Sequence, residues 1–450
     1  MFRRLLIANR GEVAARVLRT CRSLGIETVA VASAADLGSS WLEGATMVVA
    51  LGGARPADSY LDAGALVEVG RRHRCAAVHP GWGFLSENPD FAAMVESSGM
   101  TFVGPTPRAM RSMGDKSVAR ATFAELGLPV IPGTREPLAD AAAAHAEAER
   151  VGYPVLLKAV AGGGGRGMRV VERPEDLDAA FDAASAEALS SFRDGRMYLE
   201  RRLTGCAHVE VQVLGDGRGG AIHLGERECS LQRRHQKVWE ESPSAGLSEA
   251  ERAEVLPRVA EAVGRLRYRN AGTVEMLRDA TGRLWFMEMN TRLQVEHPVT
   301  ECVTGVDLVE WQLRVAAGEA LPAEPARSGH AIEVRINAED PADRFRPCPG
   351  RVARVTWPRG DGIRVDTHVS DGDRIPPNYD NLVAKLIVHG KDRPAALARL
   401  RDALAATKIE GIVTNLPLHR WLVDTTEVGS GKIDTGTLEA LLAGGTPWPS

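Results

Sequence analysis

The first hundred residues alternate short apolar runs with amphipathic stretches of helical periodicity. Four apolar runs predict strands, at residues 4–8, 27–33, 75–81 and 100–105. Three amphipathic stretches between them predict helices, at residues 12–25, 59–74 and 89–99. This alternation indicates a parallel, doubly wound α/β sheet. Such a sheet binds ligands at the carboxyl ends of its strands, where we expect the loops 9–12 and 79–88.

A glycine-rich loop follows, between two predicted strands. The first strand ends near Lys158 and the second begins at Met168. Consecutive glycines have little backbone preference, so the loop can close over a ligand and direct N–H groups at oxyanions. The pattern matches neither GxGxxG nor GxxxxGK[ST], which argues against a Rossmann or P-loop site. A flexible hairpin tip is the alternative interpretation.

From residue 197 onward the pattern changes to antiparallel hairpins. Residues 207–232 and 272–292 each predict two strands around a turn. Helical patterns follow at 248–268 and 306–317, and a further strand is predicted at 329–340. This part of the chain is therefore expected to be α+β.

Candidate chemistry gathers at the end of the second hairpin, in the segment NTRLQVEH. If this segment is extended, Arg292, Gln294 and Glu296 share one face and offer a cation, an amide and a base. Glu288 and Asn290 precede them on the same strand, opposite Glu275 in the partner strand. Hard oxygen ligands on facing strands suit Mg²⁺ shared with nucleotide phosphates, with a solvated strand face as the alternative.

Composition narrows the class of protein. The 55 basic and 59 acidic residues give a net charge of −4, which provides no electrostatic reason to expect a nucleic-acid or membrane partner. No apolar run approaches the roughly 18–20 residues of a membrane span, and no signal peptide is apparent, so a cytoplasmic protein is expected. The six cysteines show no paired spacing, which favours reduced thiols. Lysine is rare, which singles out Lys116, Lys158 and Lys237 as positions that need an ammonium group.

Nine motifs in order resemble one family. They are IANRGE, HPGWGFLSEN, MGDK, GGGGRGMRVV, HVEVQVL, QRRHQKV, MEMNTRLQVEHPVTE, RINAEDP and YDNLVAKL. Together they resemble biotin carboxylase, the ATP-grasp component of biotin-dependent carboxylases. The resemblance implies an ATP-grasp fold, with an N-terminal doubly wound parallel-sheet domain, a mobile glycine-rich lid and a C-terminal antiparallel-sheet domain. The implied domain ranges are 1–113, 114–203, 204–330 and 331–445.

The resemblance also implies a reaction. ATP, Mg²⁺ (or Mn²⁺) and bicarbonate would form carboxyphosphate, and the CO₂ released from it would be captured by biotin. Biotin would be attached to a carrier protein on a separate chain, and the carboxyltransferase would also be separate. The implied setting is an acetyl-CoA or other acyl-CoA carboxylase of fatty acid biosynthesis, with this chain as a homodimer.

Site residues carry over from the matching motifs. Those implied to contact the nucleotide or bicarbonate are Lys116, Lys158, Gly162, Gly163, Gly164, Gly165, Gly167, Met168, Glu200, Arg201, Leu203, His208, Gln232, His235, Leu277, Gln294 and Val295. The implied Mg²⁺ ligands are Glu275, Glu288 and Asn290. The implied catalytic groups are Arg292 gripping bicarbonate, Glu296 as base, Lys237 beside the transferred phosphate and Arg335 beside biotin.

Four positions depart from the family pattern. Ala161 stands beside the lid glycines, Trp82 replaces a usual tyrosine, Arg201 replaces a usual lysine, and Ala207 stands where a basic residue often occurs. None removes an implied catalytic group. Two other functions remain open at this point: a different ATP-grasp ligase, and a catalytically silent nucleotide-binding scaffold of a carboxylase complex.

Overall fold

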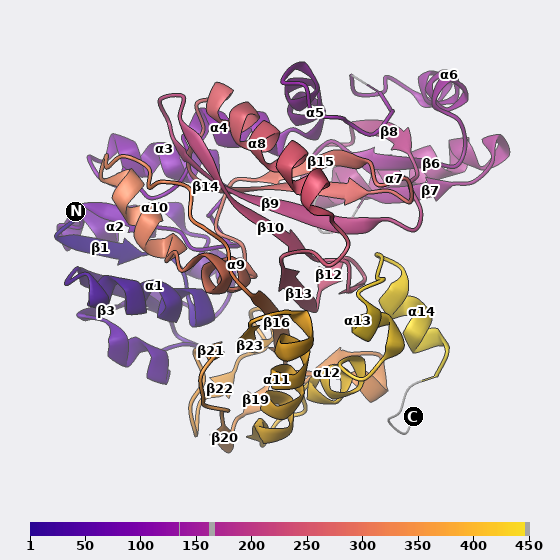
Figure 1. The fold of residues 1–450 in the computed structure, drawn as a ribbon. Helices are drawn as coiled ribbons and strands as arrows, with labels where there is room; N and C mark the ends of the chain where they lie inside the picture. Colours follow the sequence, from indigo (N-terminus) through magenta and orange to yellow (C-terminus); the bar gives the residue numbers. More distant parts are fainter. Residues whose placement is uncertain (135, 162–166, 446–450) are drawn as a thin grey trace.

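The computed structural model of the chain describes residues 1–134, 136–161 and 167–445. Its N-terminal part is a five-stranded parallel sheet in the order β3-β2-β1-β4-β5, coloured indigo and purple in Figure 1. The strands are β1 (Arg4–Ile7), β2 (Glu27–Ser33), β3 (Met47–Gly52), β4 (Ala77–His79) and β5 (Thr101–Phe102). The helices are α1 (Gly11–Ser23), α2 (Ala63–Arg72), α3 (Pro89–Ser97) and α4 (Pro107–Gly114). The predicted parallel α/β arrangement is confirmed; the edge strand β3 was not among the predicted strands.

The two predicted ligand-side loops meet at the carboxyl edge of this sheet. The side-chain amide of Asn9 donates to the carbonyls of Pro80 (2.6 Å) and Trp82 (2.8 Å), which joins the loops after β1 and β4. Gly81 has a φ of +64°, in the left-handed region, and a Cβ there would lie 2.9 Å from the Asn9 amide nitrogen. Only glycine therefore permits this close approach.

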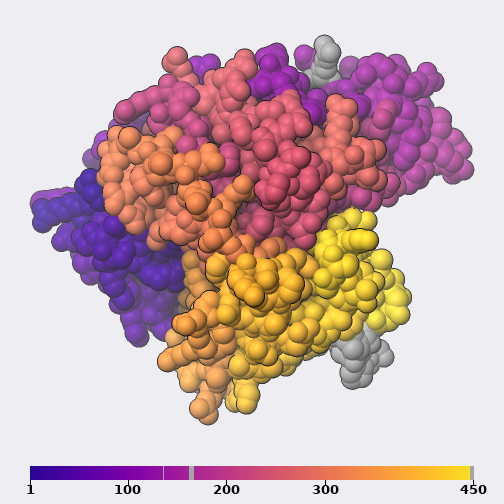
Figure 2. All heavy atoms as spheres, in the orientation of Figure 1, coloured from indigo at the N-terminus to yellow at the C-terminus, as the bar shows by residue number. Residues whose placement is uncertain are grey.

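The next segment forms a separate small lobe. After α5 (Lys116–Glu125) comes a three-stranded antiparallel sheet of β6 (Val155–Ala159), β7 (Met168–Val171) and β8 (Met197–Arg201), with helices α6 (Ala141–Val151) and α7 (Leu177–Phe192). Small buried alanines on both helices let them pack closely against this sheet. Figure 2 shows the lobe projecting from the upper right of the body. The predicted loop residues Gly162, Gly163, Gly164 and Gly165 lie outside the described residues.

The centre of the molecule is an eight-stranded sheet in the order β15-β14-β9-β10-β13-β16-β23-β21. Its strands are β9 (Ala207–Asp216), β10 (Ala221–Glu228), β13 (Trp239–Ser242), β14 (Arg269–Arg278), β15 (Leu284–Asn290), β16 (His330–Asn337), β21 (Ile363–Thr367) and β23 (Leu382–Gly390). The pairing of β13 with β16 carries the sheet across the implied domain boundary at residue 330. The two C-terminal parts of the chain therefore share one hydrogen-bonded sheet.

Helices and short strand pairs complete this C-terminal half. The helices are α8 (Glu249–Arg265), α9 (His297–Thr304), α10 (Leu308–Ala316), α11 (Arg393–Ala406), α12 (Leu416–Leu422), α13 (Thr426–Ser430) and α14 (Thr437–Ala443). The short strands are β11 (Gln232–Arg233), β12 (Gln236–Lys237), β17 (Glu339–Asp340), β18 (Arg346–Pro347), β19 (Gly350–Arg351), β20 (Arg354–Thr356), β22 (Arg374–Ile375) and β24 (Lys408–Glu410). Within the described ranges, none of the helices has the length and apolar character needed to cross a bilayer.

Candidate active site

The hairpin of β14 and β15 positions the three predicted metal ligands. Glu275 lies opposite Glu288 in the strand register, next to an irregularity in the pairing. The Asn290 side-chain amide donates to Glu275 Oε1 at 2.8 Å, while Glu288 pairs with Lys116 Nζ at 2.7 Å. The hairpin therefore gathers two carboxylates and an amide, with a predicted phosphate-binding lysine beside them. This donor set fits Mg²⁺, which prefers carboxylate and carbonyl oxygens.

Lys237, on β12, lies at the centre of a carboxylate cluster. Its Nζ is 2.5 Å from Glu210, 2.6 Å from Glu296 and 3.0 Å from Glu275. Burial disfavours the ammonium, but these carboxylates outweigh burial and raise the pKa of Lys237 well above its ordinary value. Lys237 is therefore a fixed positive charge at neutral pH.

Glu296 is held between two cations. Its Oε1 accepts from Lys237, and its Oε2 accepts from Arg335 at 2.9 Å. Burial alone would favour the neutral acid, but Lys237, Arg335 and Arg227 outweigh it and hold the pKa of Glu296 well below its usual range. Glu296 is consequently ionised at neutral pH, so its carboxylate can accept a proton.

Arg335 also contacts a second carboxylate, Glu240, at 2.5 Å. Burial raises the pKa of Glu240 to about 7, even though Arg335 favours its ionised form. The two carboxylates on Arg335 thus differ: Glu296 stays charged, whereas Glu240 titrates near neutrality. The Arg335 guanidinium contacts both carboxylates, Glu240 at 2.5 Å and Glu296 at 2.9 Å.

The segment around Arg292 differs from the extended conformation assumed above. Strand β15 ends at Asn290 and α9 begins at His297, so residues 291–296 form a loop and turn. Two of the side chains nevertheless lie together, because Arg292 donates to Gln294 Oε1 at 2.6 Å, and Gln294 donates to Glu275 at 3.2 Å. The expectation of one extended face was wrong because the turn before the helix redirects the chain.

The loop is anchored to the N-terminal sheet by Glu87. Its carboxylate accepts from Arg292 Nε at 2.8 Å and from the backbone N–H of Thr291 at 2.8 Å. Glu87 belongs to the loop 79–88, which the sequence placed at the carboxyl edge of the parallel sheet. The Arg292 guanidinium therefore links the N-terminal domain to the central sheet.

Several of the predicted nucleotide-binding residues lie on or beside the three strands of the lobe. Lys158 and Arg120 both pair with the buried Glu200, and Arg120 also donates to the carbonyl of Ile131. The Arg201 side chain instead binds the carbonyl of Val151 at 2.9 Å. Leu203, Met168 and Leu277 are half-buried, and the N–H of Gly167 donates to Glu187 at 3.3 Å.

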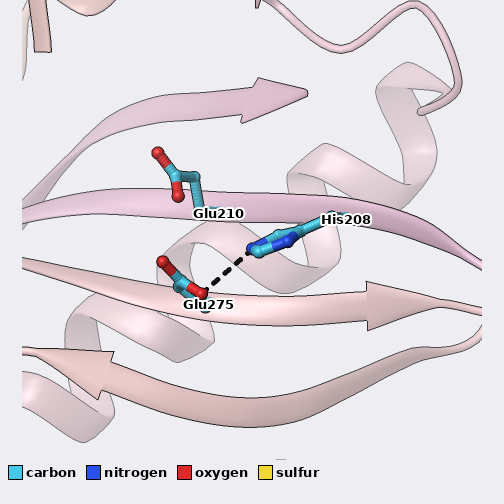
Figure 3. Close-up of side chains that lie close together, drawn as sticks. All are labelled: His208, Glu210 and Glu275. Carbon is cyan, nitrogen blue, oxygen red and sulfur yellow. Dashed lines mark ion pairs between the residues drawn. The ribbon is translucent and has the colours of Figure 1, made fainter. Parts of the chain in front are cut away.

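His208 lies on the same face of the central sheet as Glu210 and Glu275. Figure 3 shows its ring directed at Glu275, and its Nε2 is 3.1 Å from Glu275 Oε2. Gln232 contacts the other ring nitrogen at 2.7 Å. The ligand atoms of His208, Glu210 and Glu275 lie within 4.8 Å of one another, close enough to ligate one ion. His235 is exposed at the β11–β12 turn, with a φ of +65°.

Sequence reasoning missed the partners of the predicted residues. Glu210 and Glu240 supply carboxylates to Lys237 and Arg335, and the fully buried Arg227 pairs with Glu210 at 2.5 Å. The alternating motif HVEVQVL places Glu210 on one face of a strand, which was a usable signal. The pairing of Glu240 with Arg335 depends on which strands become neighbours, which the local pattern does not encode.

Comparison with known proteins gives the family. Models described as "Biotin carboxylase, N-terminal domain", "Carbamoyl-phosphate synthase L chain, ATP binding domain" and "Biotin carboxylase C-terminal domain" match residues 1–110, 115–324 and 333–440. A biotin carboxylase of Pseudomonas aeruginosa is 49% identical over 446 residues, covering 98% of this chain and 99% of that protein. The chain belongs to the biotin carboxylase family.

Two solved structures share its fold. A Campylobacter jejuni biotin carboxylase, described as a beta-gamma-ATP complex, matches with a TM-score of 0.96 and 42% identity, covering 98% of this chain and 99% of that one. The biotin carboxylase domain dimer of a Hydrogenobacter thermophilus 2-oxoglutarate carboxylase, described with MgADP, ADP and bicarbonate, matches with a TM-score of 0.95 and 43% identity, each chain being covered to 98%. The predicted family, ATP-grasp fold and class of enzyme, an ATP-dependent carboxylase ligase, are confirmed.

Proposed function

We propose that the chain carboxylates biotin on a separate carrier protein, using ATP and bicarbonate, as the first half-reaction of an acyl-CoA carboxylase. The observation that carries the proposal is the position of Glu296 between Lys237 and Arg335, in the same loop as the hydrogen-bonded pair Arg292 and Gln294. The ADP and bicarbonate named for the Hydrogenobacter structure support the same substrates for this chain.

Bicarbonate is bound in this proposal by the residues of the 292–296 loop. Arg292 offers a planar pair of donors that matches an oxyanion, and Gln294 offers a further hydrogen bond. Glu296 accepts the bicarbonate proton. As Lys237 turns toward the negative charge on the transferred phosphate, its hold on Glu296 weakens, and the proton affinity of Glu296 rises when it is needed.

The nucleotide is bound between the lobe and the central sheet. Lys116 and Lys158 neutralise its phosphates, and the segment containing Glu200, Arg201 and Leu203 holds the adenine. Glu275, Glu288 and Asn290 would hold Mg²⁺, which neutralises phosphate charge during transfer. Lys237 lies close enough to this cluster to stabilise charge on the γ-phosphate as bicarbonate attacks it.

Biotin accepts the carboxyl group in the second stage. Carboxyphosphate breaks down to CO₂ and phosphate, the phosphate takes the N1′ proton of biotin, and the ureido anion attacks CO₂. Arg335 stabilises that anion, because, despite burial, Glu240 and Glu296 raise the pKa of its guanidinium and keep it positively charged. Exclusion of water is essential, since water would otherwise consume carboxyphosphate.

The assembly is also part of the proposal. A homodimer is supported by the Hydrogenobacter domain, which is described as a dimer. A carrier protein and a carboxyltransferase on separate chains, cytoplasmic location and a role in fatty acid biosynthesis follow from the family resemblance. The final acyl-CoA is chosen by the carboxyltransferase, so acetyl-CoA is one member of the proposed class.

The test is ATP hydrolysis by the purified chain with Mg²⁺, measured with and without bicarbonate and then with free biotin. The proposal requires hydrolysis that depends on bicarbonate and is stimulated by biotin. Turnover that ignores bicarbonate would favour a different ATP-grasp ligase. No turnover under any of these conditions would favour the silent scaffold.

A further inference from the structure

Two of the sequence motifs take no part in the proposed mechanism, yet they lie together in the structure. They are IANRGE, which enters α1, and YDNLVAKL, which enters β23. The Arg10 guanidinium lies 4.3 Å from the centre of the Tyr379 ring and 3.8 Å from Asp380. Further along both motifs, Glu12 Oε1 lies 3.0 Å from Lys385 Nζ. More than 360 residues separate these segments in the sequence, so it is the fold that brings them into contact.

Lys385 also reaches the proposed bicarbonate loop. Its side chain is fully buried, and its Nζ donates to the carbonyl of Val295 at 2.9 Å. It lies directly opposite Arg335 in the pairing of β16 and β23, so the two cations share one face of the central sheet. The Lys385 ammonium therefore contacts both α1 and the turn between Gln294 and Glu296, while its backbone lies in the central sheet.

We propose that Lys385 is a positioning residue for bicarbonate, which acts by holding the Val295 carbonyl and thereby fixing the turn that carries Gln294 and Glu296. This inference rests on the proposed function. A second anchor supports the same turn, because the His297 ring donates from Nδ1 to the carbonyl of Gln294 at 2.7 Å. With the Lys385 anchor removed, the Val295 carbonyl loses its donor and the side chains on either side of it lose their fixed spacing.

The competing explanation is that Lys385 only neutralises Glu12. Glu12 is buried at the start of α1, and a buried carboxylate without its cation destabilises the fold strongly. Loss of activity in a Lys385 variant would then follow from misfolding. The two roles of Lys385 can be tested separately, because the ion pair with Glu12 and the hydrogen bond to Val295 involve different partners.

The experiment compares the wild type with Lys385→Met, Glu12→Gln and the double variant. Melting temperature is measured for each, together with kcat and the KM values for bicarbonate and ATP in the biotin-stimulated ATP hydrolysis assay. Methionine keeps the length of the lysine side chain, and glutamine keeps the shape of the glutamate. Glu12→Gln is the matched control, because it removes the ion pair and leaves the Val295 hydrogen bond.

We expect Lys385→Met to lower the melting temperature and to raise the bicarbonate KM about 10-fold, the effect of losing one hydrogen bond from a charged donor. The double variant should recover part of the lost stability, because the buried carboxylate of Glu12 is replaced by a neutral amide, while its bicarbonate KM stays about 10-fold raised. The ATP KM and the bicarbonate KM of Glu12→Gln should stay within about two-fold of wild type.

A double variant whose bicarbonate KM recovers together with its melting temperature would overturn the inference and leave Lys385 as a counter-charge. If Lys385→Met does not fold, the comparison of Glu12→Gln with the double variant decides the same question. A wild-type chain without bicarbonate-dependent turnover would instead contradict the proposed function.

Discussion

Replacing Glu296 by glutamine removes one negative charge and the proton-accepting group with almost no change in shape. The carboxylate is 1% exposed and bridges Lys237 and Arg335. Because glutamine cannot take the bicarbonate proton, we expect kcat to fall by about 10²–10⁴-fold, the usual contribution of a general base. The ATP KM should change by less than about three-fold, because Lys116 and Lys158 pair with other carboxylates.

The same substitution has an effect on stability whose sign follows from the pKa. The folded pKa of Glu296 lies well below its ordinary value of 4.5, so ionised Glu296 stabilises the fold above that value. This contribution is lost as pH falls from 4.5 through the folded pKa. The variant lacks it, so its melting temperature should be a few degrees below wild type at pH 7, and the difference should shrink below about pH 4.5.

Glu240→Gln is the matched control for this prediction. Glu240 contacts the same guanidinium, but its pKa of about 7 means that the neutral form is already common at neutral pH. We expect its kcat to fall by less than about 10-fold in the bicarbonate-dependent ATP hydrolysis assay. The reasoning is refuted if Glu296→Gln retains more than about a tenth of wild-type kcat, or if both variants lose activity equally. Loss of ATP binding in Glu296→Gln would identify a structural residue instead.

Three further predictions concern the same site. Lys237→Met removes the cation shared by three carboxylates and should lower kcat by at least about 100-fold, measured by bicarbonate-dependent ATP hydrolysis; near-normal turnover would exclude a role for Lys237 in phosphate transfer. Arg292→Lys loses the planar guanidinium that contacts Glu87 and Gln294, so the bicarbonate KM should rise about 10-fold with a smaller change in kcat. A rise in the ATP KM instead would show that Arg292 acts on the nucleotide. Removal of divalent cations by EDTA should stop turnover, and Mg²⁺ or Mn²⁺ should restore it; activity that survives EDTA would argue against the Glu275 and Glu288 metal site.

Local pattern was sufficient to predict much of the fold. The runs 4–8 and 27–33 became the parallel strands β1 and β2, because strands covered on both faces are apolar throughout. The edge strand β3 was missed, although MVVAL is also an apolar run; Met47 and Val48 are 38% and 41% exposed at the sheet edge. The boundary implied at residue 330 does not interrupt the central sheet, since strand pairing depends on the whole fold.

The residues of the candidate site were also only partly predictable from the sequence. Arg292, Gln294 and Glu296 could be picked out because they lie close together in the sequence, even though the turn after β15 was not anticipated. The residues that contact them could not be predicted from the sequence. Glu87 is 205 positions from Arg292, and Lys385 is 90 positions from Val295, so neither contact leaves a local sequence signal. The resemblance supplied the reacting groups, and the structure added the residues that hold them.

The most direct test of the central claim is the transfer of labelled bicarbonate to biotin by the purified chain. With ATP and Mg²⁺, the account predicts acid-labile carboxybiotin that carries the label and forms only when ATP is present, at a rate at least about 100-fold lower for the Glu296→Gln variant. Hydrolysis of ATP without labelled carboxybiotin at saturating bicarbonate and biotin would contradict it.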